Sequence, residues 1–491
     1  MSSKHEQQLH VAFLPYMAPG HMMPMVDIAR QFAAHGVQAT VITTTANARR
    51  LKPAVDRDAH SGNNIRLEIL PFPSAKAGLP EGCENLIDTP TPEMTIRLYG
   101  AINLLQPQFE ALLRDLRPDC IFSDVLFHWT VDVATELGVP RLAFSGSSFF
   151  NLSVSYAVEH HEPHKQTEFE REPFLIPSLP DQVTITRSQL PDIVKTRNSF
   201  TELFEKLKAA ERRSFGMVAN SFHALESAYA EYYKQAIGTK AWQVGPVSLF
   251  NKDEADKVQR GGKASVSQDS IISWLDSKGS KSVLYICFGS LTRFSKTQLV
   301  EIASTLEEVT CPFIWVVPKV LKTKKDWNKE EEWWVPEGFA ERMEESWRGM
   351  IIKGWAPQML ILEHPAIGGF LTHCGWNSIL EGVTAGVPLI TWPVIADQFY
   401  NEKLVTQALK FGVPVGSEDW KVWATEETPL ISREKIKLAV NRVMEGGHEA
   451  EEMRNIAVKL GESAKAAVEE GGSSYEELKT LIQDISSYSQ K

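Results

Sequence analysis

Short apolar segments alternate with segments of helical period along this chain, and the alternation constrains its fold more than any other feature. The first series of expected strands reads Val11 to Pro15, Ala39 to Thr43, Ile65 to Leu70, Cys120 to Ser123, Leu142 to Ser145, Met217 to Asn220 and Trp242 to Val244. Helices such as Met25 to Ala34 and Glu93 to Leu116 are expected between them. Near-continuous apolar strands joined by helices predict an α/β fold with a parallel sheet covered on both faces.

A second series follows a polar stretch rich in Gly, Ser and Lys. Its expected strands are Val283 to Phe288, Phe313 to Val317, Met350 to Ile352, Ile367 to Leu371 and Leu389 to Trp392. For a chain of 491 residues we therefore expect an N-terminal domain at 1–247, a linker at 248–269, a second domain at 270–472 and a C-terminal helix within 473–491. Lys319 to Trp334, rich in Lys and Glu, is expected to be a solvated loop. Two doubly wound domains would form a cleft at the carboxyl ends of both sheets.

Composition excludes several classes of function. The formal net charge of −11 disfavours binding to nucleic acid or to an anionic membrane surface. Five cysteines without a CxxC pair suggest reduced thiols and no zinc site. The polar N-terminus shows no signal peptide, and no apolar run reaches the roughly 20 residues of a membrane span. We expect a cytoplasmic monomer that needs no metal or other cofactor.

The stretch from Trp355 to Gln398 holds two strand-to-helix crossings suited to a nucleotide sugar. After the first strand, a polar turn leads into a helix whose unpaired N–H groups and positive dipole end favour a phosphate. His373, Asn377 and Ser378 add side-chain donors there. Glu381, four residues beyond Asn377, lies on the same helix face and is placed to accept hydrogen bonds from ribose hydroxyls.

The second crossing ends near Asp397 and Gln398, which offer acceptors and an amide to sugar hydroxyls. Each of these residues has a plainer interpretation when it is taken singly. Asn377 or Ser378 is more often a helix cap, and Glu381 or Asp397 a solvated helix residue. The hypothesis depends on the fit of many positions to one ligand.

A histidine and an aspartate follow two strands of the first domain. His21 is expected in the loop before a helix whose first turn contains Pro24, where the positive helix end would keep the imidazole neutral, as a general base requires. Asp124 ends the strand that starts at Cys120, so a parallel sheet brings it to the same rim. Taken alone, His21 would be a cap or packing residue, and Asp124 an N-cap for the helix expected near Trp129.

The segment from Trp355 to Gln398 closely resembles the signature box of plant secondary-product UDP-glycosyltransferases, without a gap. GHMMPMVDIAR around His21 is similar to the catalytic-histidine motif of that family. The resemblance implies the GT-B fold, a catalytic pair of His21 and Asp124, and a last helix that packs back on the N-terminal domain. It also implies roles for the residues of the box. Trp355 would stack on uracil, Ala356 would hydrogen-bond the uracil through its backbone, and Gln358 and Glu381 would hold the ribose. His373, Asn377 and Ser378 would bind the diphosphate, and Trp376, Asp397 and Gln398 would contact the sugar.

The expected reaction is inverting transfer of glucose from UDP-glucose to a hydroxyl group, because the Gln398 ending with Trp376 is the pattern usual in glucose users of that family. Ser290, in the turn after Val283 to Phe288, would help to meet the charge of the leaving diphosphate, and Ser145 is a further candidate for a sugar contact. An apolar acceptor pocket that includes Phe149 and Phe150 is expected, although either ring could belong to the core.

Resemblance to the subgroup with SLTRFSKTQL and WPVIADQFYNEK favours a steroidal or triterpenoid sapogenin as acceptor, with a flavonoid or coumarin as the alternative. Two other classes were weighed. An NAD(P) oxidoreductase is disfavoured because no GxGxxG opens a helix after a first-domain strand. A catalytically silent UDP-sugar-binding protein stays open by pattern, although the presence of both His21 and Asp124 argues against it.

Overall fold

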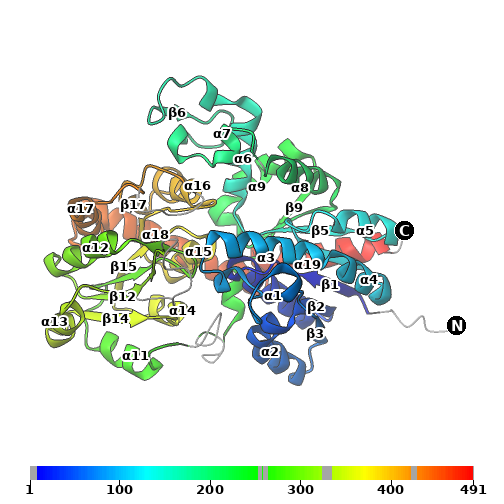
Figure 1. The fold of residues 1–491 in the computed structure, drawn as a ribbon, viewed down its shortest axis with the longest axis horizontal. Coiled ribbons are helices and arrows are strands. Elements are labelled where there is room, and N and C mark those ends of the chain that lie inside the picture. The colour runs from blue at the N-terminus through cyan, green and yellow to red at the C-terminus, as the bar shows by residue number, and fades with distance from the viewer. Residues whose placement is uncertain are drawn as a thin grey trace.

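The computed structural model describes residues 8–198, 200–252, 257, 264–322, 334–421 and 428–489. Its N-terminal half contains a seven-stranded sheet in the order β3-β2-β1-β4-β5-β8-β9, on the right in Figure 1. These strands are β3 (Ile65–Leu70), β2 (Gln38–Thr44), β1 (His10–Leu14), β4 (Cys120–Asp124), β5 (Arg141–Ser145), β8 (Gly216–Ala219) and β9 (Lys240–Gln243). All neighbouring strands run parallel. Their carboxyl ends therefore share one rim.

Helices cover both faces of this sheet because the residues of its strands alternate between two cores. The helices of this half are α1 (Pro19–Ala34), α2 (Thr45–His60), α3 (Pro92–Leu104), α4 (Gln106–Leu116), α5 (Thr130–Leu137), α6 (Phe149–His161), α7 (Asp192–Lys195), α8 (Thr201–Arg213) and α9 (His223–Ile237). Val11 and Phe13 of β1 pack in one core with α1 and α2, whereas Ala12 and Leu14 pack in the other with α3, α4 and α5.

The C-terminal half repeats the architecture with a six-stranded parallel sheet in the order β14-β12-β10-β15-β16-β17. Its strands are β14 (Gly349–Lys353), β12 (Phe313–Val317), β10 (Val283–Cys287), β15 (Ile367–Thr372), β16 (Leu389–Thr391) and β17 (Gly412–Pro414). The helices around it are α11 (Gln268–Asp276), α12 (Lys296–Glu308), α13 (Phe339–Glu345), α14 (Gln358–Leu362), α15 (Trp376–Ala385), α16 (Gln398–Lys403), α17 (Arg433–Met444) and α18 (His448–Val468). Two doubly wound α/β domains result, as the sequence predicts.

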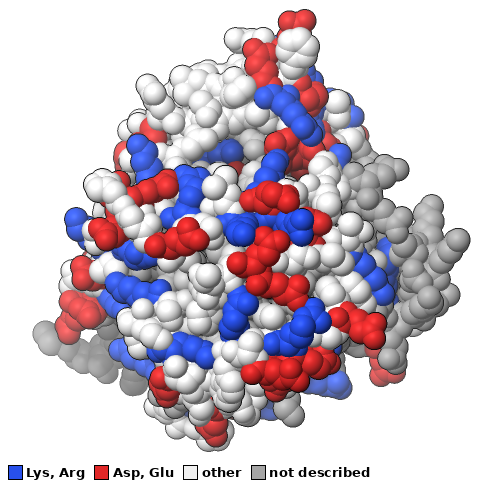
Figure 2. Space-filling view, turned by 90° about the vertical axis from the view of Figure 1, so that its left-hand side faces the viewer, with Lys and Arg blue, Asp and Glu red and all other residues white. Residues whose placement is uncertain are grey.

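The outer side of the C-terminal domain carries both signs of charge. Figure 2 shows Lys and Arg interspersed with Asp and Glu over this face. Ion pairs link α12 to its neighbours, with Arg342 of α13 on Glu307 and Lys437 of α17 on Glu308. Such exposed pairs contribute little to stability, but they balance the charge of this surface.

Two small elements join the domains. The antiparallel hairpin of β6 (Pro173–Leu175) and β7 (Thr184–Thr186), followed by the short helix η4 (Arg187–Gln189), extends from the N-terminal domain above α6 and α7 in Figure 1. Thr184 of this hairpin exchanges two hydrogen bonds with Gln407 of the C-terminal domain, at 2.8 and 3.0 Å. The last helix, α19 (Ser473–Ser489), crosses back and packs on β9.

The structure corrects several expected boundaries. The helix expected over Glu93 to Leu116 is two helices that break at Leu105, just before Pro107. Strand β17 was missed because its Pro414 cannot donate to a sheet, and β17 lies at the edge where proline is tolerated. Lys319–Val320 form strand β13, paired with β11 (Arg293–Phe294), and not the expected solvated loop. Residues 323–333 of that expected loop, and much of the expected linker, lie outside the described residues.

Candidate active site

Helix α1 begins at the rim of the first sheet and carries His21 in its first turn. The sequence placed His21 in a loop and began the helix near Met25, and this is wrong: α1 starts at Pro19, whose fixed φ suits a first helical position. Pro24 instead lies inside the helix and has no N–H to give to the carbonyl of Gly20. That carbonyl accepts a hydrogen bond of 3.1 Å from Asn377 Nδ2 of the other domain. The helix that carries His21 is thus tied directly to the start of α15.

His21 and Asp124 form a pair across neighbouring strands. The Nδ1 atom of His21 lies 2.7 Å from Oδ2 of Asp124, whose side chain is fully buried at the end of β4. An ionised carboxylate can only accept, so Nδ1 carries the hydrogen and Nε2 keeps its lone pair. The His21 side chain is 31% exposed. This is the tautomer and the accessibility that a general base requires.

The pKa of His21 is raised above its ordinary value. Desolvation is the largest influence and lowers the pKa, but the charge of Asp124, its hydrogen bond and the charge of Asp397 together raise it by more. The expected effect of the helix N-terminus, a ring held neutral, is therefore opposed by two nearby carboxylates. A basic imidazole of this kind is a stronger proton acceptor, and it must be neutral before it can act.

Residues around the pair hold it in place. The second oxygen of Asp124 accepts from the N–H of Leu126 at 3.0 Å, and the backbone carbonyl of Asp124 accepts from buried Arg141 at 3.1 Å. Asp124 is not the N-cap of the next helix, because α5 begins at Thr130 with Trp129 at its N-cap position. On the opposite side, Gly146 contacts the ring so closely that a Cβ atom there would lie 2.9 Å from His21 Nδ1.

The start of α15 faces this pair from the second domain. The indole N–H of Trp376 donates to the backbone carbonyl of Asn220, at the carboxyl end of β8, over 2.8 Å. Asn220 also contacts Asn377, with Nδ2 3.5 Å from Oδ1. Trp376 is buried, and its indole N–H is used in this contact between the domains. Its expected contact with the sugar stays a prediction. The N-terminus of α1 thus lies against that of α15, and each helix presents a positive dipole end there.

His373 lies in the turn between β15 and α15, against two glycines. A Cβ atom on Gly289 would lie 2.6 Å from His373 Cε1, and one on Gly375 2.5 Å from Nε2. Desolvation lowers the pKa of His373 to about 4, so its ring is neutral at physiological pH. Its Nδ1 atom is buried and has no partner among the described residues. The predicted site residue Ser290 directly follows Gly289, the glycine that contacts the His373 ring. An anion bound here would meet a neutral donor ring and free backbone N–H groups.

Three predicted ribose and phosphate ligands form one network. Gln358 Nε2 donates to Glu381 Oε2 at 2.6 Å and to Ser378 Oγ at 3.1 Å. The hydroxyl of Tyr285, from the centre of the sheet, donates to Gln358 Oε1 over 3.4 Å. Glu381 is buried in α15 and not the solvated residue of the plainer interpretation. The network fixes the amide orientation of Gln358, because its nitrogen must face the carboxylate.

Trp355 and Ala356 connect β14 to α14 beside this network. The backbone carbonyl of Trp355 accepts from the N–H of Ser265, and that of Ala356 from the N–H of Gln358. The indole Nε1 of Trp355 is buried without a partner among the described residues. Because the Trp355 side chain is only half-buried, part of its ring remains accessible for a flat base to stack on.

Asp397 and Gln398 follow the turn at Pro393–Ala396, here called the sugar-facing turn after the role expected of these two residues. The side-chain oxygen of Gln398 accepts from the N–H groups of Val394 and Ile395, at 2.8 and 2.9 Å. These two donors fix the amide, so Nε2 points the other way as a donor. Asp397 accepts a short hydrogen bond from Ser147, in the loop beyond β5. Burial raises the pKa of Asp397, although the hydrogen bonds from Ser147 and Asn401 act in the opposite direction and lower it.

The three weaker candidates, Phe149, Phe150 and Ser145, are all buried. Phe149 and Phe150 are fully buried, with ring centroids 5.3 Å from Tyr233 and 4.7 Å from Tyr229, so they belong to the core and offer no surface to an acceptor. Ser145 is also buried, and its Oγ accepts from the N–H of Ser147 at 3.2 Å. Ser145 therefore supports the loop that carries Ser147.

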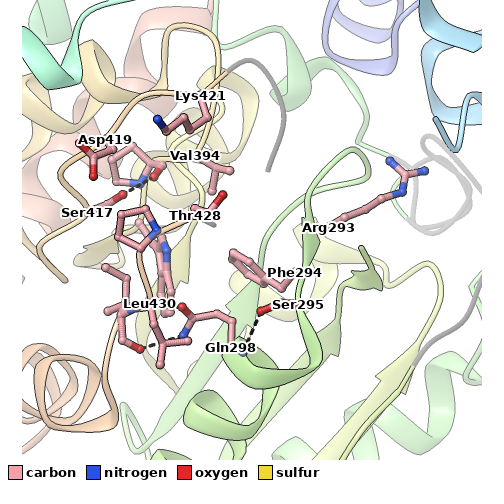
Figure 3. A pocket seen from close by; sticks show the side chains of 14 residues that line it. Arg293, Phe294, Ser295, Gln298, Val394, Ser417, Asp419, Lys421, Thr428 and Leu430 are labelled. Atoms are coloured by element: carbon pink, nitrogen blue, oxygen red, sulfur yellow. Dashed lines mark hydrogen bonds between the residues drawn. The ribbon is translucent and has the colours of Figure 1, made fainter. Parts of the chain in front are cut away.

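Pro393 and Val394 of the sugar-facing turn line a pocket. Figure 3 shows Val394 of that turn with Ser417, Asp419 and Lys421 on one side and Phe294 on the other.

Within the described ranges, no three His, Cys, Asp or Glu side chains are grouped so as to hold a metal ion. No helix of the same ranges is long and apolar enough to cross a membrane.

Several residues of the site escaped the sequence analysis. Asn220, Gly146 and Ser147 all follow strands of the first sheet at the rim that carries His21. The rule that found Asp124 would have found them, since side chains just beyond parallel strands meet at one edge. Trp420, whose indole N–H donates to the carbonyl of Ala396 at 2.8 Å, gave no such signal because it follows a strand that was not predicted.

Two facing doubly wound domains, with a His–Asp pair on one rim and a nucleotide-type helix start on the other, define a glycosyltransferase of the GT-B fold. The chain belongs to the UDP-glucoronosyl and UDP-glucosyl transferase family, whose model matches residues 13–413. It is 45% identical to UDP-glucosyl transferase 73CC6 of Saponaria officinalis, over 97% of this chain and 96% of that protein. It is 46% identical to UDP-glucose flavonoid 3-O-glucosyltransferase 7 of Fragaria ananassa, over 99% and 98%.

The crystal structure of Glycyrrhiza uralensis UGT73P12 complexed with glycyrrhetinic acid 3-O-monoglucuronide superposes with a TM-score of 0.91. The two chains are 44% identical, and the match covers 98% of this chain and 96% of the other. The protein is therefore a plant UDP-glycosyltransferase that acts on small metabolites.

Proposed function

We propose that the enzyme transfers glucose from UDP-glucose to a hydroxyl group of a steroidal or triterpenoid sapogenin and forms a β-O-glucoside. The observation that carries the catalytic part is the 2.7 Å contact between His21 Nδ1 and buried Asp124, which leaves Nε2 with the lone pair of a base. The crystal structure above, which contains a triterpenoid glucuronide, supports the acceptor class.

The proposed reaction is a single displacement. His21 Nε2 takes the proton of the acceptor hydroxyl while that oxygen attacks the anomeric carbon from the face opposite UDP. The bond from the anomeric carbon to the diphosphate oxygen breaks, and UDP leaves with the electron pair. The α-linked donor thus gives a β-linked product. Asp124 stabilises the imidazolium that forms, and its charge is already the main influence that raises the pKa of His21.

Charge on the leaving diphosphate would be met by the second domain. The helix start at Asn377 and Ser378, the neutral ring of His373 and the turn at Ser290 line the expected position of the diphosphate. Preorganised donors of this kind stabilise developing charge without rearranging. Glu381 and Gln358 would hold the ribose, and Trp355 and Ala356 the uracil.

Glucose is the proposed sugar because Gln398 presents a fixed donor beside an acceptor. Its Nε2 can donate to one hydroxyl, while Asp397 accepts from another once Ser147 releases it. Both relatives named above by sequence use glucose by their names.

A flavonoid is the second candidate acceptor, favoured by the 46% identity to the Fragaria ananassa enzyme. Incubation with UDP-glucose and a panel of sapogenins, flavonoids and coumarins, followed by mass spectrometry, decides between them. A hexose adduct on the sapogenins is expected. Adducts on flavonoids alone would transfer the assignment to the second candidate, and no release of UDP with any acceptor would indicate a silent binding protein.

The role of His21 has its own test. His21→Ala should bind UDP nearly as tightly as the parent and turn over about 10²-fold more slowly or worse, because it loses only the base. His35→Ala is a suitable control, since His35 terminates the same helix at the far end, where its Nδ1 contacts the carbonyl of Gln31. Equal turnover in His21→Ala and the parent would remove His21 from the reaction.

A further inference from the structure

The segment Ser417–Trp420, here called the strap, follows β17 and contacts both ends of the sugar-facing turn. Ser417 Oγ donates to the carbonyl of Pro393 at 2.9 Å. At the other end, the indole Nε1 of Trp420 donates to the carbonyl of Ala396 at 2.8 Å. Figure 3 shows Ser417 and Asp419 of the strap beside Val394 of the turn. The strap therefore supports the turn at both of its ends.

The sugar-facing turn needs this support because its last residue is strained. Ala396 has a φ of 54°, in the left-handed region that residues other than glycine seldom adopt. The next residue is Asp397, so the conformation of Ala396 sets the direction in which that carboxylate points. Gln398 holds the middle of the turn by accepting from the N–H groups of Val394 and Ile395. Only Trp420 among the described residues bonds the Ala396 carbonyl.

The other edge of the strap is held by the N-terminal domain. The backbone N–H of Trp420 donates to the carbonyl of Ser188 in η4 at 2.8 Å, and Ser188 Oγ donates to the carbonyl of Glu418 at 2.7 Å. Arg171 forms ion pairs with Glu418 and Asp419, at 2.7 and 3.2 Å. The strap is thus fixed between the two domains and cannot follow the turn freely.

We propose that Trp420 is a positioning residue for the donor hexose. Its indole N–H holds Ala396 in the left-handed conformation, and this directs the Asp397 carboxylate and the Gln398 amide N–H toward the sugar. The inference rests on the proposed function, in which Asp397 and Gln398 contact the hexose. UDP alone has no hexose, so its binding does not depend on the turn. Loss of the indole donor should therefore weaken UDP-glucose and spare UDP.

The test compares the two ligands on the full-length enzyme by isothermal titration calorimetry. Trp420→Phe keeps an aromatic ring but has no N–H donor. We expect the Kd for UDP-glucose to rise about three- to tenfold, the usual effect of one lost hydrogen bond, while the Kd for UDP stays within about twofold. The KM for UDP-glucose should rise in parallel. Trp347→Phe is the matched control, because Trp347 precedes β14 at the opposite edge of the same sheet and is 64% exposed.

Ser417→Ala is a second variant, in case Trp420→Phe folds poorly. It removes the hydrogen bond to Pro393 and should give the same selective loss of UDP-glucose binding. Equal weakening of UDP and UDP-glucose in both variants would overturn the proposal, since that pattern indicates general disorder. Unchanged affinity for UDP-glucose would overturn it too. Failure of the parent enzyme to bind UDP-glucose at all would instead refute the proposed function, and the inference with it.

Discussion

Replacement of Gly146 by alanine tests whether the placement of the His21 ring controls turnover. An ideal Cβ on Gly146 would lie 2.9 Å from Nδ1, 3.0 Å from Cε1 and 3.1 Å from Cγ of His21, whereas ordinary contact begins at 3.4 Å. The backbone of Gly146 is outside the left-handed region, so alanine fits the conformation, and the three atoms nearest to its Cβ all belong to the His21 ring. The new methyl group and the ring must therefore move apart, from 2.9 Å to at least 3.4 Å. Asp124 is fully buried and cannot follow, so the hydrogen bond to Nδ1 weakens.

The expected result is a loss of turnover without a loss of UDP binding. A displacement of about 1 Å in a catalytic group can cost about 10²-fold, so Gly146→Ala should lower kcat about tenfold or more. The Kd for UDP should stay within about twofold, because the predicted UDP ligands lie on the other domain. Since Asp124 then raises the pKa of His21 less, the acid limb of kcat/KM against pH should shift to lower pH.

Gly100→Ala provides the control for this experiment. Gly100 lies inside α3, and a Cβ atom there would meet nothing within 4 Å. Alanine in a helix interior is favourable, so this variant should match the parent in turnover. The reasoning is refuted if Gly146→Ala turns over at the parental rate with the acid limb in its parental position.

Two further predictions concern buried carboxylates. Asp124→Asn should lower kcat about 10²-fold and shift the acid limb of the pH–activity profile to lower pH, because His21 loses the charge that raises its pKa. Asp119→Asn is the control and should leave the acid limb in place, because Asp119 lies at the opposite end of β4, where it accepts from the backbone N–H of His10. An acid limb that does not move in Asp124→Asn contradicts the pairing of His21 with Asp124. Glu226 accepts from the N–H groups of Phe149 and Phe150 at 3.0 and 2.8 Å, and burial raises its pKa from 4.5 to about 7. The stability that the protonated Glu226 carboxyl contributes is complete below the unfolded pKa of 4.5 and is lost as pH rises through the folded pKa of about 7. The free energy of unfolding of the parent, relative to that of Glu226→Gln, should therefore fall by roughly 3 kcal/mol between pH 4 and 8. Urea unfolding at both pH values measures this, and a difference that does not change with pH contradicts it.

Much of the fold could be predicted from the sequence because parallel strands buried on both faces read as apolar runs. The expected segments Ile65 to Leu70 and Phe313 to Val317 coincide with β3 and β12. Prediction failed where proline was ambiguous. Pro24 is typical of a first helical turn, but the helix begins at Pro19 and tolerates the second proline. Pro414 concealed an edge strand.

The site was predictable where chemistry and local spacing coincide. Ser378 and Glu381 lie three positions apart on one helix, and the structure joins both to Gln358, which only the family resemblance indicated. Contacts between the domains could not be read in this way. The hydrogen bonds from Asn377 to Gly20 and from Trp376 to Asn220 join residues more than 150 positions apart, and nothing in either local sequence indicates its partner. They depend on how the domains are oriented.

The return of α19 to the first sheet bears on the order in which the molecule assembles. Leu478, Leu481 and Ile485 of α19 share one apolar cluster with Val11 and Phe13 of β1. Ser474 further donates to the carbonyl of Gly245. During synthesis on the ribosome, β1 emerges hundreds of residues before the helix that completes its cover. The amino-terminal lobe must therefore wait, with an apolar strip exposed, until α19 has been synthesised, and this interval is when a chaperone would have most to protect.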